Sequence, residues 1–283
     1  MTTELDRLRE STPRWSIERR LNFIASRLNW ERRINRADLV ARFGISPNQA
    51  TADLRRFATL HPGALVYDTR TKIYRAGPGW NRPDAADAVV LLRDLRLVAE
   101  GVLPADETAL VHAPALGLAE PPVRAVPPAI LSAVVTAIRD RRALNVVYQS
   151  FSAPEPRRRL LEPHALVFDG FRWHARAWDA DEERFRDFVL GRMSEPVDSS
   201  PAAVESDQDV EWQTSVTLEI APHPGLSAPQ RAAVEADYGM VDGRLFLTCR
   251  QAMLYYVRRR LGLMADHQQR SPQDQQIILT GIN

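Results

Sequence analysis

The stretch that decides the fold of the first part of the chain is residues 35–60, NRADLVARFGISPNQATADLRRFATL. Its first half carries apolar residues at helical spacing, starts at a candidate cap, Asn35, and stops at Gly44, a residue that often terminates helices. Its second half starts with Ser46 and Pro47, which favour the N-cap and the first helical position. Two short helices joined by a tight Gly-Ile-Ser turn are typical of a helix-turn-helix motif.

The segments on either side extend this motif. Residues 16–30 carry apolar side chains at helical spacing, and Ser16 is the expected N-cap. After the motif, the apolar runs 65–67 and 73–74 are expected to form two strands, and the loop between them is polar and basic. This pattern predicts a β-hairpin. We therefore expect a winged helix-turn-helix domain over residues 1–80.

A linker is expected to follow. Residues 84–100 show the pattern of an amphipathic helix with Asp84 as its cap, and prolines recur from Pro104 to Pro128. Residues 81–128 are therefore expected to be a helical and Pro-rich linker.

The middle of the chain is expected to be mostly β. A helix is predicted over residues 129–142, and four short β-rich segments follow it without long helices between them. Asp169-Gly170 indicates a tight turn between two of these segments. We expect a small antiparallel barrel or sheet in a domain over 129–200, and a second linker in the Ser/Pro/Asp-rich segment 194–209.

The last part alternates strand-like and helix-like segments and ends on a further strand-like run. This order predicts a small α+β domain over residues 207–283. The fold class expected for the whole chain is α+β.

Composition narrows the classes of protein. The chain has 283 residues, 45% hydrophobic and 26% charged, which is ordinary for a globular protein. It has no apolar run of about 18 residues that could span a membrane, no signal-peptide pattern at its N-terminus, and a single cysteine, Cys249, expected to be a buried small residue. We therefore expect a cytoplasmic protein.

Charge is distributed unevenly along the chain. Residues 1–80 carry fifteen basic and eight acidic residues, a net charge of +7, whereas the remainder has a net charge of −6. A basic first domain suits contact with phosphates. The first residues of a recognition helix meet base edges in the major groove, and flanking basic residues meet the backbone. The residues expected to contact double-stranded DNA are Arg36, Ser46, Asn48, Gln49, Thr51, Arg55, Arg56, Arg70 and Lys72.

A polar group in the β-rich middle suggests a second site. Strand alternation in residues 171–178 puts Arg172, His174 and Arg176 on one face. Arginines beside histidine, tyrosine and serine suit an anionic or nucleotide-like ligand, although arginines on a half-exposed sheet can also simply meet water and acidic neighbours. The expected ligand-binding residues are Tyr148, Ser150, Ser152, Arg157, Arg159, His164, Trp173, His174, Arg176 and Arg192.

Patterns typical of catalysis are missing from the sequence. It has no HExxH, CxxC pair, P-loop, GxGxxG or GxSxG, and its histidines lack metal-ligand spacing. We therefore expect no catalytic residues, no metal and no cofactor, and we do not expect an enzyme.

These residues together resemble the WYL-domain transcriptional regulators, and among them most closely the phage-defence repressors of the BrxR and CapW type, associated with BREX and CBASS loci. The resemblance rests on VVYQSF, RRRLLEPHALVFDGFRWHARAWD and RFRDFVLGRM, on the winged-helix segment, and on residues from about 210 onward, so it covers nearly the whole chain. The strand that gives the family its name reads Trp173-His174-Ala175 here, which keeps only the tryptophan. This departure leaves the identity of the ligand open.

The resemblance implies a winged helix-turn-helix, a central SH3-like WYL β-barrel and a small C-terminal α+β extension of ferredoxin-like type that dimerises. It implies a homodimeric repressor on an inverted-repeat operator of an anti-phage defence operon. A nucleotide or nucleic-acid ligand at the WYL domain would relieve repression. The alternatives are a WYL-type activator, a sensor of single-stranded nucleic acid for an unrelated operon, and an enzyme acting on nucleotides.

Overall fold

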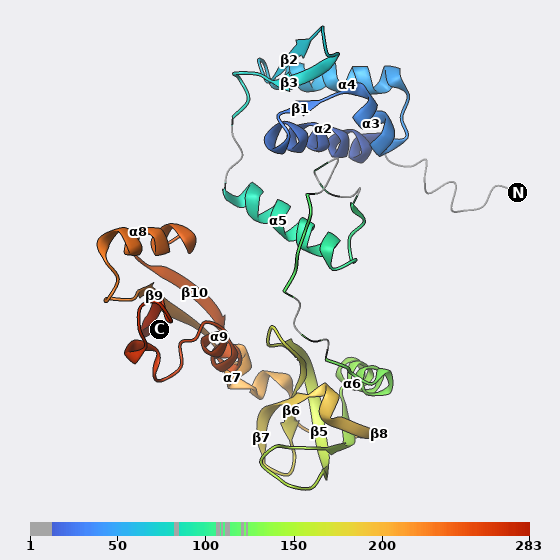
Figure 1. Ribbon diagram of the computed structural model, residues 1–283. Coiled ribbons are helices and arrows are strands. Elements are labelled where there is room, and N and C mark those ends of the chain that lie inside the picture. Colours follow the sequence, from blue (N-terminus) through green and yellow to red (C-terminus); the bar gives the residue numbers. More distant parts are fainter. Residues whose placement is uncertain are drawn as a thin grey trace, which may run out of the picture. The chain divides into compact units, whose positions relative to one another are not determined.

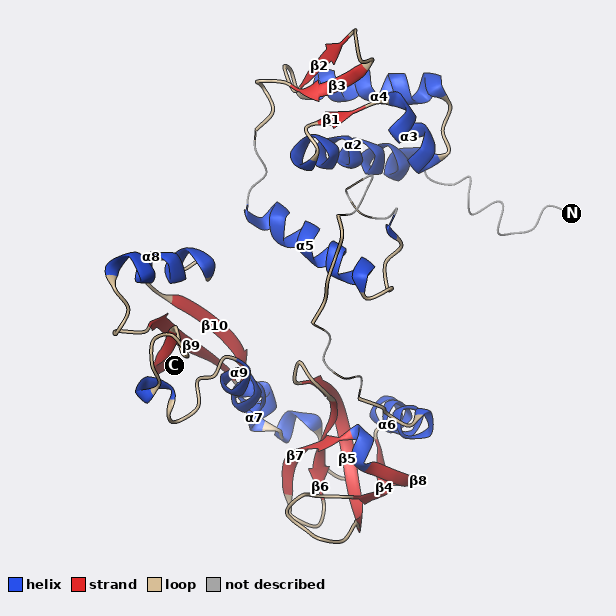
Figure 2. Ribbon diagram, in the orientation of Figure 1, coloured by secondary structure: helices blue, strands red, loops and turns tan. Residues whose placement is uncertain are grey.

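The computed structural model describes residues 13–81, 85–105, 108, 110, 114–119, 122 and 124–283. The chain divides into two compact units, residues 1–120 and 121–283. Figures 1 and 2 show the helices and strands of both units. The first unit has one cluster of buried apolar residues, and the second unit has two. The expected cap Asp84 and parts of the expected linker lie outside the described residues.

The first unit is built on the predicted helix-turn-helix. Its elements are α2 (Pro13–Trp30), β1 (Arg33–Ile34), α3 (Arg36–Phe43), α4 (Pro47–Leu60), β2 (Leu65–Asp68), β3 (Ile73–Ala76) and α5 (Ala85–Ala99). The strands pair antiparallel in the order β1-β3-β2. Apolar side chains of α2, α3 and α4 form one core, in which Leu28, Leu39 and Phe57 are fully buried.

Two details of the first unit differ from the predictions. Helix α2 begins at Pro13, so Ser16 lies inside the helix and the predicted cap is wrong. Proline is tolerated in the first turn, where backbone N–H groups have no helical partner. Strand β1 was not predicted because two residues are too few to show alternation, and the strand exists through its pairing with β3.

The second unit begins with a helix packed on a sheet. Its first elements are α6 (Pro128–Asp140), β4 (Arg142–Tyr148), β5 (Arg157–Phe168), β6 (Trp173–Asp179), β7 (Arg184–Val189) and β8 (Met193–Pro201). These strands form an antiparallel sheet in the order β7-β6-β5-β4-β8. Ile130, Val134 and Ala137 of α6 pack against the core side of this sheet.

The predicted β-rich middle is confirmed as an antiparallel sheet, but the predicted SH3-like barrel is not confirmed. Strands β7 and β8 lie at opposite ends of the strand order, and no pairing joins them among the described residues. The predicted linker over 194–209 is wrong in its first half, because residues 193–201 form β8 and pair with β4. Serine, proline and aspartate disfavour strands, and the pairing outweighs that preference at a sheet edge.

The C-terminal part follows the predicted alternation. Its elements are α7 (Val210–Gln213), β9 (Ser215–Pro222), α8 (Ala228–Asp237), β10 (Leu245–Arg250), α9 (Leu254–Arg260) and β11 (Ile277–Ile282), and its strands pair antiparallel in the order β10-β9-β11. Leu218, Ile220 and Leu263 are fully buried in its core. Helices and a three-stranded sheet together make this part an α+β domain, as predicted. The predicted ferredoxin-like arrangement is not confirmed. No described helix is long and apolar enough to cross a membrane.

Candidate nucleic-acid interface and candidate ligand face

The helix-turn-helix is held by the capping residues that the sequence predicts. Asn35 Oδ1 accepts a hydrogen bond from the backbone N–H of Asp38 at 2.9 Å, and Asp38 Oδ2 accepts one from the N–H of Asn35 at 2.8 Å. Gly44 ends α3 in the left-handed conformation, with φ of 63°. Ser46 Oγ accepts a hydrogen bond from the N–H of Gln49 at 3.2 Å. These contacts fix the start of α4 relative to α3.

Helix α4 has a buried face and an exposed face. Ala50, Leu54 and Phe57 are buried in the core of the unit. Asn48 and Arg55 lie on the exposed side of the same helix. Because the buried face anchors the helix, its first two turns present polar side chains to solvent in a fixed orientation, as a recognition helix does.

A buried ion pair links helix α4 to helix α2. Arg20 of α2 donates to both carboxylate oxygens of Asp53, from Nε at 2.6 Å and from its terminal nitrogen at 3.2 Å, and both residues are buried. Gln49 Nε2 donates to Asp53 Oδ1 at 3.0 Å. Asp53 therefore orients the side chain of Gln49. The sequence reasoning missed Asp53, and its only signal was an acidic residue on the apolar side of α4.

The hairpin of β2 and β3, which we call the wing, has a basic tip between its strands. Asp68 Oδ1 accepts hydrogen bonds from the N–H groups of Arg70 at 3.0 Å and Thr71 at 3.2 Å. The hydrogen bonds from Thr71 hold the pKa of Asp68 below its usual value. The side chains of Arg70 and Lys72 are exposed at this tip.

The nine residues predicted to contact DNA all lie in this first unit, on α3, α4 and the wing. Eight are exposed: Arg36, Ser46, Asn48, Gln49, Arg55, Arg56, Arg70 and Lys72. Thr51 is half-buried, and its hydroxyl donates to the carbonyl of Pro47 at 2.9 Å. Their contacts with DNA stay predictions.

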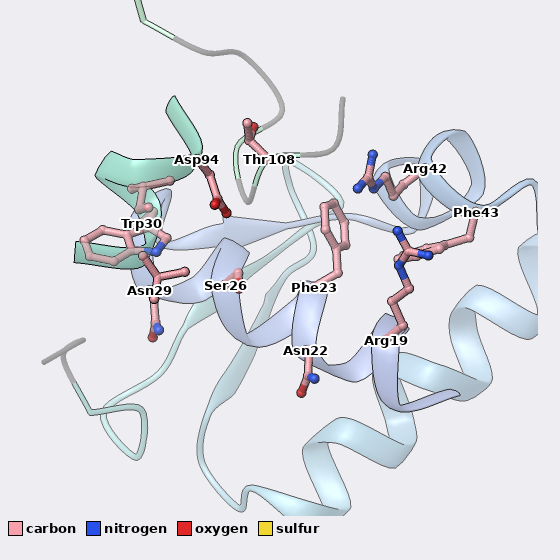
Figure 3. Close-up of a pocket in the computed structure, with 12 residues that line it drawn as sticks. Arg19, Asn22, Phe23, Ser26, Asn29, Trp30, Arg42, Phe43, Asp94 and Thr108 are labelled. Atoms are coloured by element: carbon pink, nitrogen blue, oxygen red, sulfur yellow. The ribbon is translucent and has the colours of Figure 1, made fainter. Parts of the chain in front are cut away.

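A cavity of about 280 Å³ also lies in the first unit, lined by residues of α2, α3 and α5 and by Thr108 (Figure 3). Phe23 and Phe43 meet edge to face with ring centroids 5.4 Å apart, and Asp94 of α5 also lines the cavity. The sequence reasoning assigned no role to it.

The predicted ligand residues of the second unit do not form a single open face. Tyr148 belongs to the core: it is 8% exposed, its ring packs on Phe188 with centroids 5.1 Å apart, and its hydroxyl accepts a hydrogen bond from the N–H of Val189. Ala175 and Ala177 of β6 lie in the same core. The alternation predicted for β6 is therefore confirmed, with His174 and Arg176 on the opposite face.

That opposite face of β6 is covered by the segment that leads into the C-terminal domain. Arg176 is 3% exposed and donates to both oxygens of Asp209, at 2.7 and 2.9 Å, and to Glu211 at 2.9 Å. His164 Nε2 lies 2.9 Å from Asp209 Oδ2. Asp187 of β7 completes the cluster at 3.5 Å from Arg176. The structure thus brings His164 and Arg176 together around one buried carboxylate.

The pKa values of this cluster follow from burial and from the ion pairs. Burial lowers the pKa of His164, although Asp209 opposes this shift. Burial alone would raise the pKa of Asp209, but its hydrogen bond and charge interaction with Arg176 outweigh burial and lower it. Burial raises the pKa of Asp187, with Arg176 as the main opposing charge. Burial thus favours the neutral form of His164 beside the charged pair of Arg176 and Asp209.

A second pair of a histidine and an aspartate lies at the start of β6. His174 Nε2 is 3.0 Å from Asp169 Oδ2, in the tight turn that the sequence predicts. Asp169 also accepts hydrogen bonds from the N–H groups of Phe171 and Arg172, both at 2.7 Å. Tyr256 of α9 packs on His174 with ring centroids 5.2 Å apart and donates to Asp187 at 2.9 Å. Helix α9 is thereby attached to the sheet.

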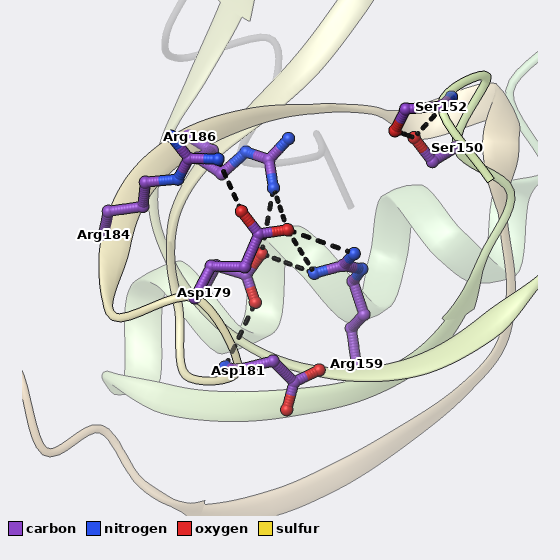
Figure 4. Close-up of polar contacts among 8 residues, drawn as sticks. Ser150, Ser152, Arg159, Asp179, Asp181, Arg184 and Arg186 are labelled. Carbon is purple, nitrogen blue, oxygen red and sulfur yellow. Dashed lines mark hydrogen bonds and ion pairs between the residues drawn. The ribbon is translucent and has the colours of Figure 1, made fainter.

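The remaining predicted ligand residues are dispersed. Arg159 pairs with the buried carboxylate of Asp179 at 2.7 Å, and Arg186 joins them at 3.5 Å (Figure 4). The hydroxyls of Ser150 and Ser152 bind each other at 2.7 Å in a separate loop (Figure 4).

Three further members of the predicted set lie on the surface or near it. The guanidinium of Arg192 lies over the ring of Phe151 at 3.8 Å from the centroid. Arg157 and Trp173 are exposed. Ligand binding by all ten predicted residues stays a prediction.

The described residues contain no group of three or more His, Cys, Asp and Glu side chains placed to hold a metal ion. Cys249 is half-buried on β10, packed against the C-terminal core, and burial raises the pKa of its thiol. The sequence predicted a buried residue at this position, and the structure shows a partly buried one.

Comparison with known proteins assigns a family to each part. Residues 16–82 match the BrxR transcriptional regulator winged helix-turn-helix domain, residues 129–197 match the WYL domain, and residues 215–283 match the BrxR transcriptional regulator C-terminal dimerization domain. A solved structure of proteasome accessory factor B/C (PafBC) of Arthrobacter aurescens aligns with a TM-score of 0.32 and 18% identity, over 94% of this chain and 44% of that one.

Two curated relatives match along most of their length. The DNA-binding transcriptional repressor CapW of Stenotrophomonas maltophilia is 46% identical over 256 residues, 89% of this chain and 85% of the relative. The CapW repressor of Escherichia coli (strain KTE188) is 36% identical over 273 residues, 94% of this chain and 89% of the relative. The chain therefore belongs to the CapW family of WYL-domain DNA-binding transcriptional repressors.

Proposed function

We propose that this repressor binds an inverted-repeat operator as a homodimer, with one helix α4 in each half-site, and controls an anti-phage defence operon. The observation that carries the proposal is the exposed polar start of α4 above a fixed apolar face. Amide side chains such as Asn48 and Gln49 pair with adenine, and arginines such as Arg55 pair with guanine. Arg70 and Lys72 on the wing suit phosphate contacts, which set register and affinity.

Sensing of an anionic ligand by the WYL domain is the second part of the proposal. The buried Arg176 is held by Asp209 and Glu211, which lie just before the C-terminal domain. An anion, such as a nucleotide or a nucleic-acid fragment, that reaches Arg176 would compete with these carboxylates and release that segment. A ligand that prefers the released state shifts the population, and a coupling of about 1–3 kcal/mol lowers operator affinity about 5–150-fold.

A gel shift with the DNA upstream of the gene tests the DNA-binding part. The double variant Gln49→Ala, Arg55→Ala is expected to bind at least about tenfold more weakly, because each bidentate base contact is worth about 1–3 kcal/mol. Arg139→Ala is the matched control, since Arg139 is exposed and pairs with its neighbour Asp140. Equal affinity of the double variant and the control for that DNA would contradict the proposal.

A further inference from the structure

A second cavity lies within the C-terminal unit, where the WYL sheet meets helix α9. It has a volume of about 450 Å³, within the range of small-molecule sites. We call it the seam pocket. Its lining residues are Arg124, Asp169, Gly170, Phe171, Arg172, Tyr256, Arg259 and Arg260. None of them is among the ten predicted ligand residues, although the sequence placed Arg172 on the same strand face as His174 and Arg176.

The seam pocket has a strong excess of positive charge. Four arginines line it, from three segments: the chain before α6, the β5–β6 turn and the last turn of α9. The only carboxylate in the lining, that of Asp169, accepts hydrogen bonds from two backbone N–H groups, lies 3.0 Å from His174 Nε2 and forms an ion pair with Arg172 at 3.5 Å. The ion pairs found among the described residues include none between a carboxylate and Arg124, Arg259 or Arg260.

Two of the four arginines have a local partner: Arg172 Nε lies 3.5 Å from Asp169 Oδ2, and Arg259 donates to the hydroxyl of Tyr255 at 3.5 Å. Arg124 lies over the ring of Phe171, 4.7 Å from its centroid. The side chain of Arg260 lies against the β5–β6 turn at Gly170, where a Cβ would come within 2.8 Å of one of its nitrogens. The side chain of Arg172 is mostly buried, and its Nε forms only the long contact with Asp169 and no hydrogen bond.

A plainer role for the arginines of α9 is stabilisation of the helix C-terminus, where cations are favourable. Arg258 fills that role, since its Nε donates to the carbonyl of Leu263 at 3.0 Å. Arg259 and Arg260 make no such bond to a carbonyl among the described residues, and both line the cavity. Stabilisation of the helix end also cannot explain why Arg124 and Arg172, which lie outside α9, line the same pocket.

We propose that the seam pocket binds a small anion with two or more adjacent phosphate groups, such as a nucleoside di- or triphosphate. Planar guanidinium groups bind phosphate oxygens in pairs, and four of them around one carboxylate leave an excess of three positive charges. That charge matches a di- or triphosphate better than a monophosphate. The claim that such binding alters operator affinity rests on the proposed function, but the site itself does not.

Calorimetric titration of the full chain, without DNA, tests the site. ATP and inorganic pyrophosphate are expected to bind, AMP more weakly, and adenosine not measurably. The double variant Arg259→Ala, Arg260→Ala is expected to weaken ATP binding by about tenfold or more, because hydrogen bonds to charged groups are lost. The matched control is Arg139→Ala, Arg231→Ala, which removes two exposed arginines elsewhere in the unit and should leave ATP binding unchanged.

Two results would overturn the proposal. One is that neither ATP nor pyrophosphate binds with a Kd below about 1 mM, or that both double variants bind ATP equally well. The other is that a single-stranded thymidine oligonucleotide binds at this pocket and pyrophosphate does not compete with it, which would make the ligand a nucleic acid. Because no DNA operator is present, a failure of operator binding leaves this test unaffected.

Discussion

At the scale of single residues, buried carboxylates hold polar side chains in place in both units. Asp53 holds Arg20 within the core of the first unit and orients Gln49 on the exposed start of α4. Asp209 does the same in the second unit, since it holds both Arg176 and His164. In each case one carboxylate fixes a polar side chain that the sequence had suggested for ligand or DNA contact.

Replacing Asp53 tests the first of these carboxylates. Asp53→Ala leaves Arg20 buried and unpaired, and we expect it to lower the free energy of unfolding of the first unit by about 3–5 kcal/mol. Urea denaturation measures this loss. The double variant Arg20→Met, Asp53→Leu removes both charges and should recover most of the stability. A loss below about 0.5 kcal/mol in Asp53→Ala would show that the ion pair does not support α4.

His164 predicts how stability depends on pH. Burial holds its pKa below the usual 6.5, so the unfolded chain binds the proton more readily than the folded chain. The stability from neutral His164 is present above pH 6.5 and is lost as pH falls from there toward the folded-state pKa. We expect the Tm to fall between pH 7.5 and 5.5, and to fall less in His164→Gln. Equal decreases in both proteins would contradict this assignment.

At the scale of elements, local signals predicted the helix boundaries better than the sheet edges. The caps Asn35, Gly44 and Ser46 act within a few residues of themselves, so the sequence was enough to place α3 and α4. Strands β1 and β8 were missed because each depends on a partner far along the chain. The contact of Arg176 with Asp209 was missed for the same reason.

The capping box of α3 gives a prediction at this scale. Asn35→Ala removes the hydrogen bond that Asn35 Oδ1 accepts from the N–H of Asp38, keeps the reciprocal bond from the backbone N–H of residue 35, and should lower the free energy of unfolding by about 0.5–2 kcal/mol. Thermal or urea unfolding measures the change. Asn48→Ala is the control, because Asn48 is an exposed asparagine that forms no cap. An equal loss of unfolding free energy in both variants would mean that the cap at Asn35 does not stabilise α3.

At the scale of the whole molecule, the family assignment connects a DNA-binding domain, a WYL domain and a dimerization domain in one chain. Within the second unit, the WYL sheet and the C-terminal domain are joined by buried polar contacts of Arg176 and Asp187 with Asp209 and Tyr256. Such contacts can be formed or broken, and a ligand that binds one of these two states more tightly shifts the equilibrium between them.

Asp209→Ala tests this connection. It leaves Arg176 without its bidentate partner in a buried site, and we expect a loss of about 3–5 kcal/mol of stability in the second unit. Hydrogen exchange should become faster over residues 206–213. Glu211→Ala is the control, since Glu211 is more than half exposed and its pair with Arg176 should be worth less than about 1 kcal/mol. Unchanged exchange in Asp209→Ala would mean that the cluster does not hold the segment.

The most direct test of a dimer on an inverted repeat uses the spacing between half-sites. Footprinting of the upstream DNA defines the operator, and gel shifts then compare it with a version lengthened by about half a helical turn between its two halves. We predict that affinity for the lengthened operator falls to that for a single half-site, because two linked recognition helices can no longer reach both major grooves on one side of the duplex. Unchanged affinity for the lengthened operator would contradict the account.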